Sequence, residues 1–121
     1  MKRYGLAAIL LFLSGCASIT PHPASKGGAM LDEGIKRYED GNYGDAVAEI
    51  QKALHAGLSD QEKVKAHKFL AFIYCVSDKQ TLCKTEFTKA LAIDPKFNLA
   101  PDEAGHPIWG PVFRSVKPTK K

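Results

Sequence analysis

The chain lacks most of the residue patterns on which catalysis and metal binding depend. It has no glycine-rich phosphate loop and no arrangement of Ser, His and Asp that argues for a nucleophilic triad. Its four histidines have no cysteine or carboxylate at the spacing of a zinc site. Asp102 and Glu103 are adjacent, but their position suits the start of a helix better than a catalytic pair. We therefore expect a protein that is not an enzyme and that holds no metal ion or other cofactor.

Clustered positive charge and long apolar runs are also scarce. The formal net charge is +4, and basic and acidic residues are interspersed along the chain. The basic residues gather only in the tail, at Lys117, Lys120 and Lys121, whereas nucleic-acid-binding proteins show a basic stripe. The one long apolar run, residues 6–13, is too short to cross a hydrocarbon core of about 30 Å as a helix. These absences argue against a nucleic-acid partner and against a transmembrane anchor.

The amino-terminal residues carry the most specific motif in the chain. Lys2 and Arg3 precede the apolar run, which ends in the tetrapeptide Leu-Ser-Gly-Cys at residues 13–16. This arrangement resembles the signal peptide and lipobox of bacterial lipoproteins. The resemblance implies that residues 1–15 are a cleaved signal peptide and that the Cys16 thiol carries a diacylglycerol. An ordinary secretory signal with an incidental cysteine is the alternative.

The residues after Cys16 bear on the location of the protein. Residues 16–28 contain two prolines and a glycine pair, which is typical of a flexible tether. Ala17 stands where an aspartate would resemble the inner-membrane retention signal of lipoproteins. The resemblance therefore implies a protein held by its lipid alone at the periplasmic face of the outer membrane.

An internal repeat organises the rest of the chain. From residue 29 onward the apolar residues follow the helical period, and no stretch alternates as a half-buried strand does. Similar residues recur at an offset of 37, as from Ala46 to Cys83 and from Ile50 to Phe87. The small residue Gly34 meets the small residue Ala71 at the same offset. We therefore expect an all-α domain in which each half is a helix, a short turn and a second helix.

Residues that commonly cap helices mark the expected boundaries. Ser59 and Glu62 have the spacing of a capping box, in which each side chain bonds the backbone of the other. Asn42 or Asp78 could cap the second helix of each half. Pro95 follows a helical stretch that it cannot continue.

The repeated residues resemble the tetratricopeptide repeat family, whose unit is a helical hairpin of about 34 residues. The residues that carry the resemblance are Gly34, Gly41, Tyr43, Ala46, Ile50, Ala53 and Leu54, then Leu70, Ala71, Tyr74, Phe87, Ala90, Leu91 and Pro95. The resemblance implies two such hairpins over residues 29–97. The spacing is longer than in the family, and Asp78 replaces the turn glycine of the second unit.

Two units are fewer than such arrays normally need, so the open apolar end requires a cover. Residues 98–121 are the candidate capping segment and basic tail. Trp109, Val112 and Phe113 lie on one helical face, which predicts a short capping helix from Pro111 to about Val116. Residues 101–107 are expected to form an ordered loop.

The repeat resemblance also places the two remaining cysteines. Cys75 and Cys83 would face each other near the turn of the second hairpin, which favours a structural disulfide in an oxidising compartment. Two buried free thiols or a redox-active pair are the alternatives, although the spacing differs from that of Cys-x-x-Cys motifs.

The same resemblance implies a partner-binding groove lined by the first helix of each unit. The positions carried over are Leu31, Ile35 and Tyr38 from the first unit and Lys65, Lys68 and Phe72 from the second. Tyr38 and Phe72 would anchor a peptide or helix, and the lysines would favour an acidic segment. Alternatively, the carboxy-terminal segment packs there and these residues belong to the core.

These features together predict a non-catalytic scaffold that holds a protein partner at the outer membrane. Residues 98–114 also resemble the tail of small repeat-bearing lipoproteins encoded with envelope secretion machines, which implies an accessory role in such a complex, the type VI apparatus in particular. A pilotin-like assembly factor and a peptidoglycan-associated envelope-maintenance lipoprotein are the alternatives. The sequence leaves the partner's identity and the oligomeric state open.

Overall fold

All regular secondary structure in the described part of the chain is helical. The structure is a computed structural model that describes residue 15 and residues 24–119, so Cys16 and the predicted signal peptide up to residue 14 lie outside the described residues. Within the described ranges the chain forms six helices and no strand, which confirms the expected all-α class. The helices are α1 (Gly28–Glu39), α2 (Tyr43–Ala56), α3 (Asp60–Val76), α4 (Gln80–Ile93), α5 (Pro101–Ala104) and α6 (Trp109–Val116). None of these helices is both long enough and apolar enough to cross a bilayer.

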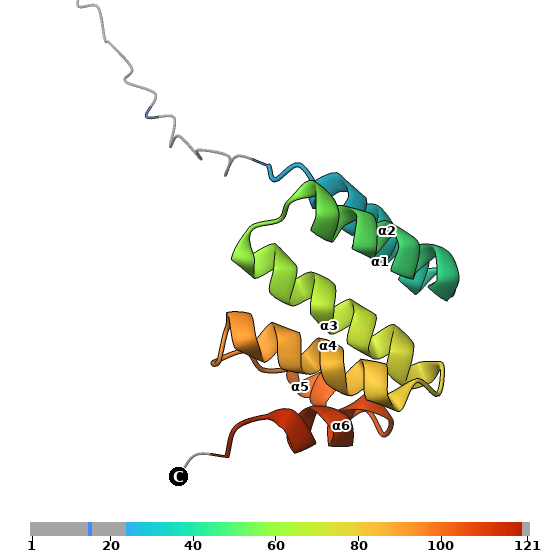
Figure 1. The fold of residues 1–121 in the computed structure, drawn as a ribbon, viewed down its shortest axis with the longest axis vertical. Helices are drawn as coiled ribbons and strands as arrows, with labels where there is room; N and C mark the ends of the chain where they lie inside the picture. Colours follow the sequence, from blue (N-terminus) through green and yellow to red (C-terminus); the bar gives the residue numbers. More distant parts are fainter. Residues whose placement is uncertain (1–14, 16–23, 120–121) are drawn as a thin grey trace, which may run out of the picture.

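The helices pack as two antiparallel pairs followed by a cover. α1 pairs with α2, and α3 pairs with α4. α3 also contacts both helices of the first pair, so it lies between that pair and α4 (Figure 1). α6 packs on α4 and α3, and α5 packs on α6, so the carboxy-terminal segment closes the open side of the second pair.

The turn inside each helix pair has the same backbone conformation. Gly41 and Asp78 are the positive-φ residues that follow α1 and α3, with φ of 80° and 59°. The next amide then bonds back into the helix, from Asn42 to the Arg37 carbonyl and from Lys79 to the Tyr74 carbonyl, both at 2.8 Å. A left-handed residue with such a backbone bond is a common way to end a helix. The 37-residue offset of the sequence is therefore repeated in the geometry of the turns.

This turn also corrects one expectation about helix caps. Asn42 is the N-cap of α2 but makes no side-chain capping bond. Asp78 lies in the left-handed turn, and the N-cap of α4 is Lys79. The capping role suggested for Asn42 or Asp78 is therefore wrong. The capping box of α3 is confirmed, because the Ser59 hydroxyl accepts from the Glu62 amide and the Glu62 carboxylate accepts from the Ser59 amide.

Small residues stand where the helices of a pair cross closely. A Cβ added at Gly34 would lie only 2.6 Å from the Cγ1 of Ile50, so α1 could not keep this distance from α2 with a larger residue. Ala71, the repeat equivalent on α3, is fully buried in the apolar core formed by α3, α4 and α6. Burial of Ile50 and Ala46 opposite Gly34 completes the interface of the first pair.

The carboxy-terminal segment differs in detail from the sequence-based expectation. Residues 101–104, predicted to lie in a loop, form the short helix α5, and α6 begins at Trp109 rather than at Pro111. The Trp109 indole N–H donates to the Glu103 carbonyl at 2.8 Å, which ties the start of α6 to α5. Trp109, Val112 and Phe113 are buried against the second helix pair, as predicted for a capping helix.

Candidate functional surfaces

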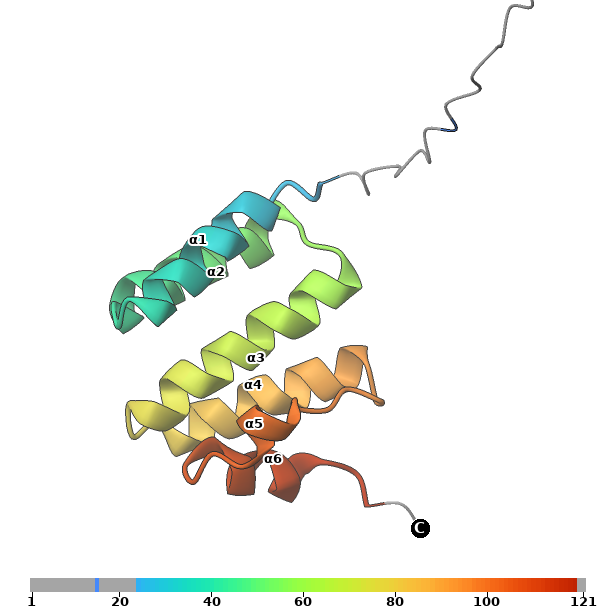
Figure 2. The same ribbon diagram turned by 180° about the vertical axis from the view of Figure 1, so that it is seen from behind.

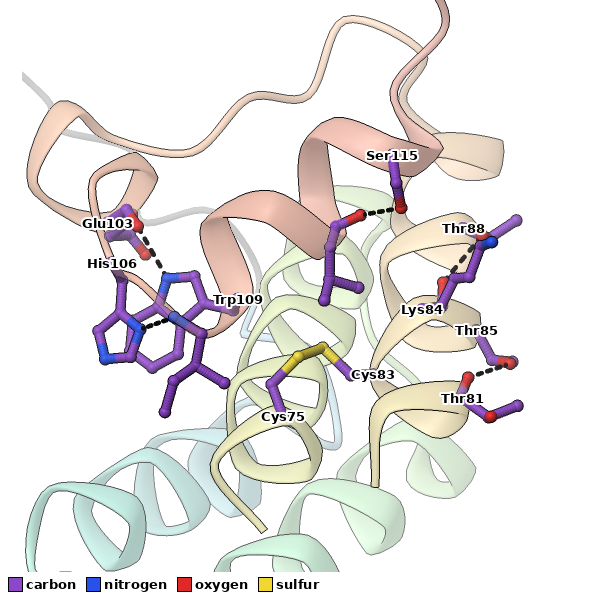
Figure 3. The surroundings of a disulfide bond; sticks show 12 residues. Cys75, Thr81, Cys83, Lys84, Thr85, Thr88, Glu103, His106, Trp109 and Ser115 are labelled. Atoms are coloured by element: carbon purple, nitrogen blue, oxygen red, sulfur yellow. Dashed lines mark hydrogen bonds between the residues drawn. A yellow bond between two sulfur atoms is a disulfide. The ribbon is translucent and has the colours of Figure 1, made fainter. Parts of the chain in front are cut away.

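The two cysteines of the second helix pair are joined. Cys75, near the end of α3, and Cys83, in the first turn of α4, form a disulfide with Cα atoms 5.1 Å apart. Figure 3 shows the bond spanning the two helices with α6 beside it. Both cysteines are buried in the cluster that contains Val112, so the bond is shielded from solvent. This geometry agrees with the structural disulfide that the repeat resemblance implies.

Two of the residues assigned to the partner-binding groove belong to the core. Leu31 and Phe72 are each only 2 % exposed. The ring of Phe72 stacks on the Trp109 indole with centroids 4.1 Å apart, so the carboxy-terminal segment occupies the place of the expected partner. The anchor role predicted for Phe72 is therefore wrong, and the groove is closed over the second unit.

The other groove residues lie on the surface formed by α1 and α3, and they differ in exposure and in their contacts. Ile35 and Tyr38 are half-buried, and the Tyr38 ring meets the Phe69 ring edge-on at 5.3 Å. Lys68 is engaged, because its ammonium lies 2.9 Å from the carboxylate of Glu103. Lys65 alone is exposed. What is left of the predicted groove is a short aromatic strip beside one free lysine.

A polar cluster around the buried Glu86, between α3 and α4, was not found by sequence reasoning. The Glu86 carboxylate is buried and lies 2.6 Å from Nδ1 of His67 and 2.9 Å from the ammonium of Lys89. Burial alone would raise the pKa of Glu86, but the hydrogen bonds and charges of His67 and Lys89 outweigh it, and the pKa is lowered. The signal available in the sequence was weak, because His67 and Glu86 are 19 residues apart on different helices.

The composition of this polar cluster differs from that of a metal centre. Its members are a histidine, one carboxylate and a lysine, and a lysine ammonium competes with a cation for the same oxygen. Among the described residues no three or more His, Cys, Asp or Glu side chains converge as metal ligands would. The His67–Glu86 contact joins α3 to α4, and the Lys89–Glu86 contact lies within α4.

The exposed apolar side chains gather at one end of the helix stack. We define the distal end as the end that holds the turns at residues 40–42, 77–79 and 105–108, away from residue 24, where the described chain enters (Figure 2). Among the described residues, four large apolar side chains are at least 39 % exposed. Tyr43, Leu82 and Ile108 lie at or next to the distal turns, and only Met30 lies near the other end. Tyr43 and Leu82 also line a common hollow, whereas Ile108 does not.

A hollow opens between two of these residues. It has a volume of about 280 Å³ and is lined by Tyr43, Gly44, Val47, Ile73, Tyr74, Ser77, Lys79 and Leu82. We call it the α2/α4 hollow, because α2 and α4 form its walls and α3 forms its floor. The pKa of Tyr74 is raised by burial and by the charge of Glu86.

Comparison with known proteins adds no assignment to these surfaces. The chain matches no protein-family model, no curated protein and no solved structure.

Proposed function

We propose that this chain is a lipid-anchored, non-catalytic interaction protein at the periplasmic face of the outer membrane. The observation that carries the proposal is that the two ends of the folded domain differ. The chain enters at one end of the helix stack, and the exposed apolar side chains of Tyr43, Leu82 and Ile108 lie at the opposite end. An anchor at one end of the domain would leave the exposed apolar side chains at the other end accessible to a partner.

The lipobox-like tetrapeptide at residues 13–16 supports the membrane half of this proposal. The segment between Cys16 and α1 contains 11 residues, 17–27, which reach at most about 40 Å when fully extended. The domain would thus stay close to the membrane, with its distal end accessible. The buried disulfide supports an oxidising compartment, because such bonds persist there and are rare in the cytosol.

The two helix pairs are proposed to be tetratricopeptide-like units, with α6 as a cap. Equal turns at Gly41 and Asp78, and the small residues at Gly34 and Ala71, support this relationship. The stacked rings of Phe72 and Trp109 explain how two units suffice, since the cap buries the apolar face that a third unit would cover. An accessory place in an envelope secretion complex, the type VI apparatus in particular, is the narrower form of the proposal.

Localisation is tested by labelling cells with a fatty-acid analogue and separating the two membranes. The full-length protein is expected to incorporate label and to fractionate with the outer membrane. Cys16→Ser should abolish the label, and Ala17→Asp should keep the labelled protein in the inner membrane. Unlabelled wild-type protein in the soluble periplasmic fraction would disprove the lipid anchor.

The interaction half is tested by photo-crosslinking in cells. A photoreactive residue in place of Ile108, at the distal end, should give a defined crosslinked product with an envelope-complex subunit. The same residue in place of Lys96, an exposed position just after α4, serves as the control. Recovery of the protein alone, or only with murein fragments, would contradict the scaffold and favour envelope maintenance.

A further inference from the structure

The disulfide of the second helix pair lies beneath α6. Cys75 and Cys83 are 4 % and 0 % exposed, and they share an apolar cluster with Trp109, Val112 and Phe113 of α6. Figure 3 shows α6 running beside the bond. Thiol–disulfide exchange requires a thiolate to reach one of the two sulfur atoms. The folded domain therefore shields the bond from an external thiol for as long as α6 stays docked.

The seam between α4 and α6 is incompletely filled. A hollow of about 330 Å³ opens there, lined by Gln80, Thr81 and Lys84 of α4 and by Pro111, Val112 and Ser115 of α6. Of these lining residues, Val112 alone also belongs to the apolar cluster of the disulfide. The side chain of Val112 is therefore the point at which this hollow meets the cover of the bond.

α6 is held on the second helix pair by apolar and ring contacts. The Trp109 indole stacks on Phe72 of α3, and the Phe113 ring meets the Phe87 ring of α4 edge-on at 5.1 Å. The described side-chain hydrogen bonds of α6 stay within the carboxy-terminal segment, and they are made by Trp109, Arg114 and Ser115. Among the described residues, α6 can therefore leave α3 and α4 without breaking a side-chain hydrogen bond to either helix.

The packing of the other helices does not depend on α6. The apolar cluster between the first helix pair and α3, which contains Ile50 and Leu70, includes no residue of α6. α5 has its own tie to α3, since the Lys68 ammonium lies 2.9 Å from the Glu103 carboxylate. Proteins open locally in cooperative units at free energies below that of global unfolding. Undocking of α6 is such a unit here, because it leaves the packing of the first pair on α3 unchanged.

Exposure of the bond permits a balanced exchange with an external dithiol. One thiolate of the dithiol attacks a sulfur of the Cys75–Cys83 bond, the S–S bond breaks, and the departing thiolate takes up a proton. The second thiol of the reagent loses its proton, attacks the mixed disulfide and releases the other cysteine. Two electrons pass to the cysteine pair, and the dithiol is oxidised to a disulfide. The reverse sequence forms the bond.

We propose that α6 is a movable cover that controls thiol–disulfide exchange at Cys75–Cys83, so that the bond is broken or formed when α6 undocks while both helix pairs stay folded. α6 then has two roles, as the cap of the repeat and as the element that regulates access to the bond. This inference goes beyond the proposed function, since it depends on neither the lipid anchor nor the partner.

The test measures how fast dithiothreitol reduces the purified full-length protein in native buffer without denaturant. Samples are alkylated at intervals, and the free thiols at positions 75 and 83 are counted by mass spectrometry. When opening and closing are fast, the reduction rate is proportional to the population of the open state. Val112→Ala should raise the rate about tenfold, because it removes two buried methyl groups from the contact that holds α6 down.

Ile50→Val is the control variant, since Ile50 is fully buried between α1 and α2 and lies outside the cluster of the disulfide. It should lower the urea midpoint of unfolding but change the reduction rate less than about twofold. Rates that rise in both variants in step with their loss of global stability would show that reduction requires complete unfolding, and would overturn the inference. So would a wild-type rate as fast as that of an unfolded peptide disulfide.

A second measurement needs no variant that must fold. The reduction rate of the wild type is followed at urea concentrations below the unfolding transition. Its dependence on urea reports the surface exposed in the reactive opening. Undocking of α6 alone exposes less surface than unfolding, so the slope should be well under half of the equilibrium m-value. A slope equal to the equilibrium m-value, or no reduction below the transition, would overturn the inference.

Discussion

The indole ring of Trp109 lies on the phenyl ring of Phe72, with centroids 4.1 Å apart and planes inclined by 21°. This contact joins the carboxy-terminal segment to the centre of α3. The His106 ring also stacks on Trp109, and the centroids of these two rings are 3.4 Å apart. Through this contact, a segment predicted to be a simple cap becomes part of the core, and Phe72 is removed from the surface.

Trp109→Ala should destabilise the domain strongly. The change removes a buried indole and leaves a cavity beside Phe72, for which about 3–5 kcal/mol of unfolding free energy is expected to be lost. Urea unfolding followed by circular dichroism measures the loss. Ile108→Ala is the neighbouring control, because Ile108 is 47 % exposed and should cost less than about 0.5 kcal/mol. Equal effects of the two substitutions would show that α6 does not pack as described.

Gly34→Ala and Gly44→Ala should change stability in opposite directions. At Gly34 the new methyl group would collide with Ile50, which predicts a loss of about 1–3 kcal/mol through overpacking. At Gly44 the methyl group meets open space, so the higher helix propensity of alanine should stabilise the domain by up to about 1 kcal/mol. The urea midpoints of the two variants measure this. A gain at Gly34 would disprove the close crossing of α1 and α2.

Glu86→Gln should remove part of the acid sensitivity of folding. The pKa of Glu86 is lowered in the folded state, because the hydrogen bonds and charges of His67 and Lys89 outweigh the cost of burial. The stabilisation from its charge is therefore fully present above the unfolded pKa of about 4.3 and is lost as the pH falls through the lower folded pKa.

The measurement for Glu86 is the urea midpoint from pH 7 down to pH 3. The wild type should be more stable than Glu86→Gln at neutral pH, and the difference should shrink below about pH 4.3. Glu39→Gln, an exposed position on α1, provides the comparison. A difference that stays constant to the lowest pH would contradict the paired, ionised state of Glu86.

Reduction of the Cys75–Cys83 disulfide should weaken the domain without abolishing its helical content. The bond closes a short loop, with a sequence separation of 8, so the expected loss is about 2–3 kcal/mol. Urea unfolding of the wild type with and without dithiothreitol measures the loss. The double variant Cys75→Ala and Cys83→Ala should show no response to dithiothreitol. A wild type that is equally indifferent to reduction would mean that the bond contributes nothing.

Local sequence patterns were sufficient to predict the helices and several of their boundaries. The period of the apolar residues identified both helix pairs, and α3 begins at the predicted Ser59–Glu62 capping box. Such features depend on residues within one or two turns of each other, so the sequence records them directly. The capping role of Asn42 or Asp78 was wrong because Asp78 adopts the left-handed turn and Asn42 makes no side-chain bond.

The candidate surfaces could be identified only from the tertiary structure. The apolar period shows which side of α3 is apolar, but it does not show what covers that side, so the sequence left open whether Phe72 anchors a partner or packs against the carboxy-terminal segment. The stacking on Trp109 decides for the second. The pairing of His67 with Glu86 depends on how α3 and α4 are rotated against each other, which no local spacing encodes. The helical class, the internal repeat and the lipobox-like amino terminus could all be predicted from the sequence. Only the packing of distant helices decided which apolar side chains are core and which, at Tyr43 and Leu82, are left at the rim of an open hollow.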